Sequence, residues 1–228
     1  MTTSLTRTYD TYHFGLSLNL SDKGLKQLIR IFEAPTDKCD TILGGRTSIT
    51  ITHLEGIGSV AVKHYYRGGL VQYINRRKYL NLGKTRCQIE YEWLQKVKTI
   101  GINAPEPIAF AYRGRLLYQA WLVTREIKHH QTLAQISRTN EERSRMVMKE
   151  VIKQIATLIK NNIYHTDLHP GNIIVDNQNY VYLLDFDKGS FFKGEKNILK
   201  DRYLRRWKRA IQKHRLPEVL NEIIFSDL

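Results

Sequence analysis

The chain has 228 residues, of which 42% are hydrophobic and 25% are charged. This composition is typical of a globular protein and too apolar for a wholly disordered chain. Two cysteines, Cys39 and Cys87, exclude a disulfide scaffold and a four-cysteine zinc site. Apolar runs are too short to span a bilayer, and the first ten residues lack the apolar region of a signal peptide. We therefore expect the protein to remain where it is made, with reduced thiols.

Charge is the first positive indication of a function. The chain carries 36 Lys and Arg against 22 Asp and Glu, a formal net charge of +14. Such a field attracts polyanions, which include nucleic acids, acidic membrane surfaces and phosphorylated substrates. Charge alone does not choose among them.

The front half of the chain has a mainly β pattern. Residues 1–40 are mixed and polar, with a short helix expected near residues 23–32. Period-two alternation of β-branched residues predicts strands at 47–52 and 59–63, joined as a hairpin by the turn at 55–58. Residues 67–83 are basic and punctuated by glycine, which indicates a loop with a short helical piece.

One helix interrupts these strands. Residues 86–99 have a helical pattern, with Ile89, Trp93, Leu94 and Val97 on one face. The helix should stop at Gly101, because the prolines that follow forbid its continuation. Two further strands are expected after it, at 108–112 and 116–124, with Arg-Gly-Arg between them.

The back half has a mainly helical pattern. Apolar residues recur at helical spacing from 147 to 159, which predicts an amphipathic helix ending near 161–162. Two short strands follow at 172–175 and 180–184, with a hairpin turn between them. The tail from Lys196 is basic and helical. We expect an α+β fold in one domain, with a β-rich N-terminal lobe at about 1–127 and a mainly helical C-terminal lobe at about 128–228.

The densest polar sequence is His-Thr-Asp-Leu-His-Pro-Gly-Asn at 165–172, followed by Leu-Leu-Asp-Phe-Asp-Lys-Gly at 183–189. Asp167 and Asn172 bracket one loop, and Asp185 ends the second strand of the short hairpin. Because the hairpin brings the loop and the strand end together, two carboxylates and one amide oxygen are expected to converge. Oxygen ligands of this kind suit Mg²⁺, which completes its shell with water and substrate phosphates.

These motifs resemble those of the protein-kinase-like enzymes. The 165–172 segment is similar to their catalytic loop, in which an Asn follows the Asp by five residues. Asp-Phe-Asp at 185–187 is similar to their metal-binding Asp-Phe-Gly, with the third residue changed. Val-Ala-Val-Lys at 60–63 is similar to the strand that presents their nucleotide-binding lysine, and all three motifs occur in the expected order.

Within that class, the chain most resembles the bacterial lipopolysaccharide core kinases, above all those for 3-deoxy-D-manno-octulosonic acid (Kdo). The resemblance extends from about residue 44 to 190 and lies in short segments that together are specific. These segments are Gly-Gly-Arg at 44–46, His-Tyr-Tyr-Arg-Gly-Gly at 64–69, Lys-Tyr-Leu at 78–80, Glu-Tyr at 90–91, the Gly-to-Pro turn at 101–107 and Asp-Phe-Asp-Lys-Gly at 185–189.

The resemblance implies ATP and Mg²⁺ as cofactors. It also implies a role for each candidate residue in the second half of the chain. Asp167 would be the catalytic residue that accepts the proton of the acceptor hydroxyl and orients that oxygen. Asn172 and Asp185 would hold Mg²⁺. His165 would be structural and would hold the loop.

We expect residues in the first half of the chain to bind the nucleotide. Lys63 would bind its α- and β-phosphates, and Glu90 would orient Lys63 through an ion pair. Glu92 is the alternative partner, because the helix phase is open at this point. Gly44, Gly45 and Arg46 would cradle phosphates through backbone N–H groups, or would form a plain turn.

The acceptor implied by the resemblance is a Kdo hydroxyl on a lipid A precursor. The alternatives are a heptose or another small molecule as acceptor, and, outside the enzymes, a pseudokinase or a nucleic-acid-binding protein. We expect no nucleic acid and no obligate protein partner.

The enzyme should act on the cytoplasmic side of the inner membrane, as a peripheral protein. The tail at 200–215 has two interpretations: a helix that packs on the C-terminal lobe, or an interfacial helix drawn to anionic lipid.

Overall fold

The computed structural model describes residues 5–34, 48–65, 79–80, 83–115, 117–221 and 224. The chain forms two compact units. The first contains Met1–Gln95 and Glu106–Glu126, and the second contains Lys96–Pro105 and Ile127–Leu228. The 96–105 segment thus belongs to the second unit, although it precedes the last two large strands of the first.

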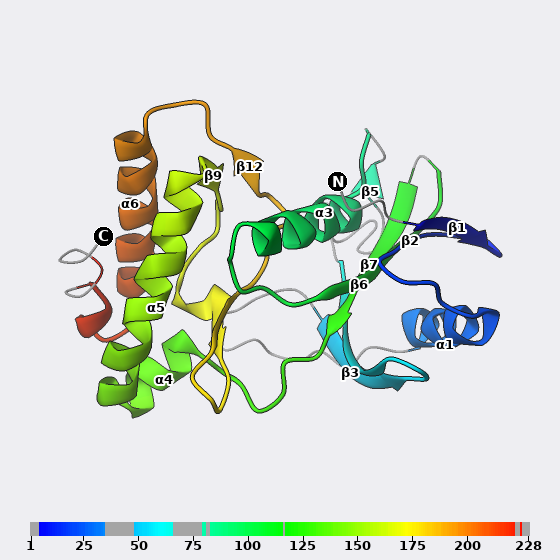
Figure 1. Cartoon of the computed structure of the whole chain (residues 1–228), viewed down its shortest axis with the longest axis horizontal. Helices are drawn as coiled ribbons and strands as arrows, with labels where there is room; N and C mark the ends of the chain where they lie inside the picture. Colours follow the sequence, from blue (N-terminus) through cyan, green and yellow to red (C-terminus); the bar gives the residue numbers. More distant parts are fainter. Residues whose placement is uncertain are drawn as a thin grey trace. The chain divides into compact units, whose positions relative to one another are not determined.

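The first unit is built on an antiparallel sheet with the order β1-β2-β6-β7-β4-β3, and β5 pairs with β7 (Figure 1). Its elements are β1 (Leu5–Tyr9), β2 (Tyr12–Leu16), α1 (Asp22–Glu33), β3 (Ser48–Leu54), β4 (Gly58–His64), β5 (Tyr79–Leu80), α3 (Arg86–Thr99), β6 (Pro107–Arg113) and β7 (Leu117–Arg125). The last turn of α3, from Lys96, belongs to the second unit. The predicted β3–β4 hairpin, the helix at 86–99 and the β6–β7 pair are all present. Most of the segment expected as a loop at 67–83 lies outside the described residues.

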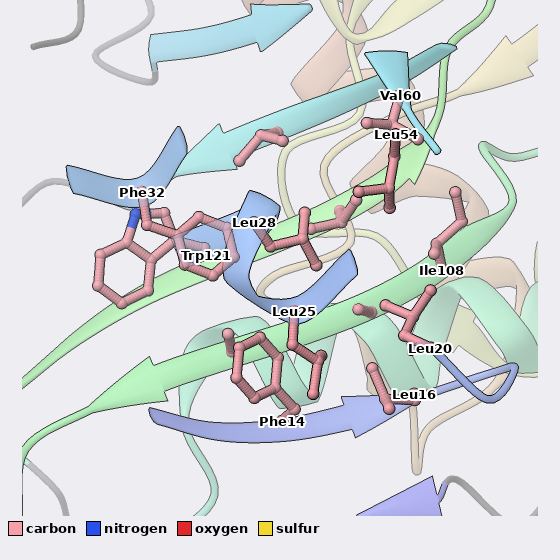
Figure 2. Close-up of a cluster of buried hydrophobic side chains, with 14 of the residues drawn as sticks. Phe14, Leu16, Leu20, Leu25, Leu28, Phe32, Leu54, Val60, Ile108 and Trp121 are labelled. Atoms are coloured by element: carbon pink, nitrogen blue, oxygen red, sulfur yellow. The ribbon is translucent and has the colours of Figure 1, made fainter. Parts of the chain in front are cut away.

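Helix α1 covers one face of this sheet. Ser21 caps the helix by accepting a hydrogen bond from the Gly24 N–H at 3.2 Å. Figure 2 shows the side chains that α1 buries against the strands, with the Phe32 ring stacked on Trp121 of β7 at 4.7 Å between centroids. Val60 and Val62 of β4 belong to this core, so the residues between them on β4 face the opposite side of the sheet.

Helix α3 covers that opposite face. Its Tyr91 ring meets the Phe110 ring of β6 edge to face, with 5.1 Å between centroids. Leu94 and Val97 are buried as the sequence predicts, whereas Ile89 and Trp93 are only half-buried. The buried stripe is rotated, because the helix turns Cys87, Glu90 and Tyr91 toward the sheet instead.

The hairpin of β1 and β2 is absent from the sequence-based prediction, which gave only a helix before residue 40. Strand β1 is an edge strand whose residues are exposed or half-buried, so it lacks an apolar alternation. Strand β2 is better buried, but Gly15 breaks its pattern. This glycine is required by packing: a Cβ atom there would lie 2.0 Å from the Phe110 ring, its neighbour in register on β6.

The second unit is mainly helical. Its helices are α4 (Leu133–Thr139), α5 (Glu141–Lys160), the 3₁₀ turn η1 (Pro170–Asn172) and α6 (Lys196–His214). Its short strands are β8 (Gln131–Thr132), β9 (Ile163–Tyr164), β10 (Ile173–Val175), β11 (Val181–Leu183) and β12 (Ser190–Phe191), paired as β11-β10-β8 and β12-β9. Together the two units make an α+β fold with one β-rich and one mainly helical part, as the sequence predicts.

The 96–105 segment is held to the second unit by hydrogen bonds from both backbone groups of Asn103. The Asn103 carbonyl accepts from the Leu183 N–H of β11 at 2.9 Å. The Asn103 N–H donates to the side chain of Gln154 on α5 at 3.2 Å, and the Gln154 amide donates to the Val181 carbonyl. The buried Gln154 thereby joins helix, strand and segment.

Helix α6 packs by its apolar side within the second unit. Leu199, Tyr203, Trp207, Ala210 and Ile211 are buried along it, and the Trp207 indole donates to the Leu220 carbonyl at 3.1 Å. This is the packing interpretation of the basic tail; the apolar face is not available to enter lipid. Among the described residues, no helix has the length and apolar character needed to cross a bilayer.

Two glycine substitutions test this account of the first unit. Gly15→Ala should lower the free energy of unfolding by about 1–3 kcal/mol, because the new methyl group meets a buried ring. Gly24→Ala is the matched control, because Gly24 lies within helix α1 and its new Cβ would be 3.7 Å from the nearest atom. This substitution should raise the free energy of unfolding by about 0.5–1 kcal/mol. Urea denaturation measures both, and a Gly15→Ala protein as stable as the wild type would contradict the packing argument.

Candidate active site

Lys63 lies on β4, on the face of the sheet that α3 covers. Its Nζ atom is 2.9 Å from Oε1 and 2.7 Å from Oε2 of Glu90, so the carboxylate is engaged by both oxygens. The Lys63 side chain is 16% exposed and that of Glu90 is 4% exposed. Solvent screens a pair this well buried only little, and removal of either partner would leave an uncompensated buried charge.

Tyr65, the residue after β4, is a third member of this group that sequence reasoning missed. Its hydroxyl donates to Glu90 Oε2, and the Lys63 ammonium lies 5.1 Å from the centre of its ring. Tyr65 is itself buried and its N–H donates to the Ala120 carbonyl of β7. The sheet thus fixes the tyrosine, and the tyrosine helps to fix the carboxylate that holds Lys63.

The two glutamates left open by the sequence have different partners. Glu92 pairs with Lys84 at 2.6 Å in an exposed salt bridge on the outer side of α3. Glu90 is therefore the partner of Lys63, because the phase of α3 turns it inward. Gly44, Gly45 and Arg46 lie outside the described residues.

One hydrogen bond closes the 165–172 loop of the second unit, and two more tie the loop to Leu184, the residue after β11. The Asn172 amide nitrogen donates to the Asp167 carbonyl at 2.9 Å. The Leu184 N–H donates to the Asn172 carbonyl at 2.9 Å, and His165 Nε2 lies 2.7 Å from the Leu184 carbonyl. The backbone that carries Asp167 and Asn172 is therefore joined to the residue immediately before Asp185.

His165 is buried, and its hydrogen bonds define its tautomer. The Asp167 N–H donates to Nδ1, so Nε2 carries the proton and donates to Leu184. The ring also packs edge to face against Phe186, with 4.5 Å between centroids. These contacts match the structural role expected for His165.

Asp185 has a left-handed backbone, with φ at +65°. Few residues other than glycine adopt this conformation, although Asp and Asn do so several times more often than most. Held local backbone strain of this kind is concentrated at functional sites. On one side of Asp185, Leu184 is bonded to the loop, and on the other, the buried Phe186 ring packs on His165.

Asp167 has an ionic partner that could not be selected from the sequence. Arg206 of α6 donates from Nη2 to Oδ1 of Asp167, across 39 residues of sequence. Tyr203, one turn earlier on α6, donates to the Ile163 carbonyl and accepts from the His165 N–H, each at 2.8 Å. Helix α6 thus contacts Asp167 itself and the backbone of residues 163 and 165 just before it.

His169 lies in the same loop and caps η1, accepting the Gly171 N–H at Nδ1. Burial, and after it the neighbouring His214, whose ring is stacked at 6.3 Å between centroids, lower the pKa of His169 to about 4. The imidazole is therefore neutral at pH 7.

The oxygen ligands needed for a cation can be assessed from these contacts. No group of three or more His, Cys, Asp or Glu side chains within the described ranges could hold a metal ion. A magnesium ion needs no such group, since it keeps several waters and takes further oxygens from phosphates. Because Asn172 donates through its nitrogen, its amide oxygen is the atom suited to a cation.

The structure brings Lys63 to Glu90 within the first unit and Asp167 to Asn172 within the second. With a β-rich lobe that carries the lysine and a helical lobe that carries the Asp and Asn, the chain has the two-lobed protein-kinase-like fold. More narrowly, it belongs to the lipopolysaccharide kinase (Kdo/WaaP) family, whose sequence model matches residues 44–220.

Curated relatives agree with this membership. A 3-deoxy-D-manno-octulosonic acid kinase of Vibrio parahaemolyticus is 32% identical over 189 residues, which cover 82% of this chain and 78% of that protein. A protein with the same name from Haemophilus influenzae (strain 86-028NP) is 31% identical over 215 residues and 84% of each chain.

The buried Lys63–Glu90 pair leads to a prediction about stability. Glu90→Gln should lower the free energy of unfolding by roughly 2–4 kcal/mol, because it leaves a largely buried ammonium without its counter-charge. Glu92→Gln removes the same charge from the same helix, but from an exposed pair, and should cost less than about 1 kcal/mol. Denaturation without nucleotide measures both; equal losses would contradict the assignment of Glu90.

Proposed function

We propose that the protein is an ATP-dependent phosphotransferase that phosphorylates a Kdo hydroxyl of a lipid A precursor in lipopolysaccharide core biosynthesis. Membership of the lipopolysaccharide kinase family and the relatives named as Kdo kinases support the acceptor. The observation that carries the reaction class is the pair of polar groups, Lys63 with Glu90 and Asp167 with Asn172, each built into its own unit.

Lys63 is proposed to bind the α- and β-phosphates of ATP. Phosphoryl transfer needs little covalent help from a protein, so most catalysis is positioning and neutralisation of charge. A lysine held by Glu90 and Tyr65 presents its ammonium in one place and loses little freedom on binding phosphate. The backbone N–H groups of Gly44 and Gly45, with Arg46, are proposed to contact the same phosphates.

Asn172 and Asp185 are proposed to hold Mg²⁺, which when bound neutralises phosphate charge. Their fixed backbones, tied through Leu184, supply one amide and one carboxylate oxygen. Asp167 is proposed to accept the proton of the acceptor hydroxyl as that oxygen forms its bond to the γ-phosphorus and ADP leaves. The Asn172 amide holds the Asp167 backbone for this task.

This division of roles predicts different effects for different substitutions. Asp167→Asn should leave Mg²⁺-ATP affinity within about three-fold but lower turnover by roughly 10²–10⁴-fold, because it removes the proton acceptor. Lys63→Ala and Asp185→Ala should weaken nucleotide binding as well as turnover. Calorimetry measures the nucleotide, and phosphate incorporation into glycolipid measures turnover.

Asp201→Asn is the matched control, since Asp201 is an exposed residue of α6. It should behave as the wild type. An Asp167→Asn protein that keeps most of its activity would remove the centre of the proposal. Mass spectrometry of the lipid A–core from cells with and without the gene identifies the sugar, and a missing phosphate on heptose would reassign the acceptor.

We also propose that α6 rests on the anionic surface of the inner membrane, on its cytoplasmic side. The apolar face of α6 is buried, so the contact would be electrostatic and made by the opposite face. That face is rich in exposed cations, which are Arg202, Arg205, Lys208, Arg209 and Lys213. A surface that carries anionic lipid attracts each such residue by about 1 kcal/mol.

Sedimentation with vesicles tests this surface. Binding to anionic vesicles should fall steeply as salt rises, because screening shortens the reach of the field. Replacing Arg205 and Lys208 by Gln should lower binding by roughly thirty-fold, at about 1 kcal/mol for each charge. The control variant replaces two exposed lysines of α5, Lys149 and Lys153, by Gln in the same way. Equal, salt-insensitive binding to neutral vesicles would overturn the proposal.

A further inference from the structure

Helix α6 is anchored to the segment around Asp167 by one buried hydroxyl. The Tyr203 OH donates to Ile163 and accepts from His165, so it is satisfied on both sides by the backbone of that segment. Burial raises the pKa of Tyr203, which keeps the phenol protonated and able to donate. The position and rotation of α6 against the segment are therefore fixed at residue 203.

Arg206 lies three residues further along the same side of α6. Its side chain is 30% exposed and reaches Oδ1 of Asp167, whose side chain is 41% exposed. Its Nε atom is buried, and no described residue accepts a hydrogen bond from it. Burial and the nearby Arg209 lower the pKa of Arg206, but a guanidinium remains charged throughout the physiological range.

Asp167 is consequently held at two points. Asn172 bonds its backbone carbonyl, and Arg206 pairs with one carboxylate oxygen. The carboxylate of an aspartate rotates about a broad, two-fold torsion, so fixing one oxygen also fixes the other. Within the described part of the chain, Oδ2 is then the oxygen that can face an acceptor hydroxyl.

We infer that Arg206 is a positioning residue for the reaction: it holds Oδ1 of Asp167 so that Oδ2 receives the proton of the acceptor hydroxyl. The inference rests on the proposed function of Asp167. In the step, the hydroxyl proton passes to Oδ2, the sugar oxygen bonds to the γ-phosphorus, and the bond from that phosphorus to ADP breaks. Arg206 touches none of the transferred atoms.

A purely structural role for the pair has little to support it. Partly exposed ion pairs contribute at most about 1 kcal/mol to folding. Helix α6 is already held by five buried residues, one of which is Tyr203 with its two hydrogen bonds. Loss of the Arg206 guanidinium should therefore change stability little and turnover much.

The test compares Arg206→Ala and Arg206→Lys with Lys149→Ala, which removes an exposed charge from α5 in the same unit. Arg206→Ala should lower kcat by roughly 10–100-fold, the worth of one charged hydrogen bond, and leave the KM for ATP within about three-fold. Arg206→Lys should recover part of the loss, because lysine keeps the charge but lacks the planar fork. Lys149→Ala should match the wild type.

A double-mutant cycle separates positioning from general damage. In an Asp167→Asn background, Arg206→Ala should cost less than about three-fold, because its target is already gone. Full additivity of the two losses, or an Arg206→Ala protein with wild-type kcat, would overturn the inference. If Arg206→Ala does not fold, the cycle is run with Arg206→Lys and Arg206→Gln, judged by the same criteria.

The activity of the wild-type enzyme separates a failure of this inference from a failure of the proposed function. A wild-type enzyme that transfers no phosphate to the Kdo glycolipid would overturn the proposed acceptor. The cycle would then be run on the slow hydrolysis of Mg²⁺-ATP, in which water replaces the sugar hydroxyl. Non-additive losses there would uphold the positioning role of Arg206, and additive losses would overturn it.

Discussion

One neutral imidazole, that of His165, lies where three segments of the second unit meet. His165 accepts a hydrogen bond from the Asp167 N–H on one ring nitrogen and donates to the Leu184 carbonyl from the other. Its backbone N–H is bonded to Tyr203 of α6, and its ring packs on Phe186. A single buried residue, through its ring and its backbone N–H, thereby holds together a loop, a strand end and a helix, which are the three segments that carry the charged residues of the site.

In the first unit, the polar side chain of the site is held in place by an ion pair. Lys63 stands on an inner strand and must keep a cation largely out of water, which costs free energy unless a partner compensates it. Glu90 supplies the counter-charge, and Tyr65 donates a further hydrogen bond to the Glu90 carboxylate. The two units thus fix their polar groups differently, one through a buried ring and the other through a buried ion pair.

Much of this arrangement follows from local sequence. The β3–β4 hairpin, α5 and the 165–172 loop have strong periodicity or dense polar motifs, which are local signals. The β1–β2 hairpin was missed because an edge strand needs no apolar alternation. Arg206 could not be selected because it is one of many cations on α6, and only the packing of Tyr203 determines which of them reaches Asp167. Tyr65 was missed for a similar reason, as its value lies in a contact with another element.

The 96–105 segment has a consequence for how the protein can be made. It belongs to the second unit, yet it leaves the ribosome before β6 and β7, which complete the sheet of the first. Its partners, Gln154 and Leu183, are synthesised roughly 50 and 80 residues later, so its hydrogen bonds stay with water until then. A fragment that starts after residue 126 would also lack Asn103 and would leave Gln154 and β11 without these partners. Neither unit is therefore a contiguous piece of chain, and dissection at the apparent boundary would yield two incomplete halves.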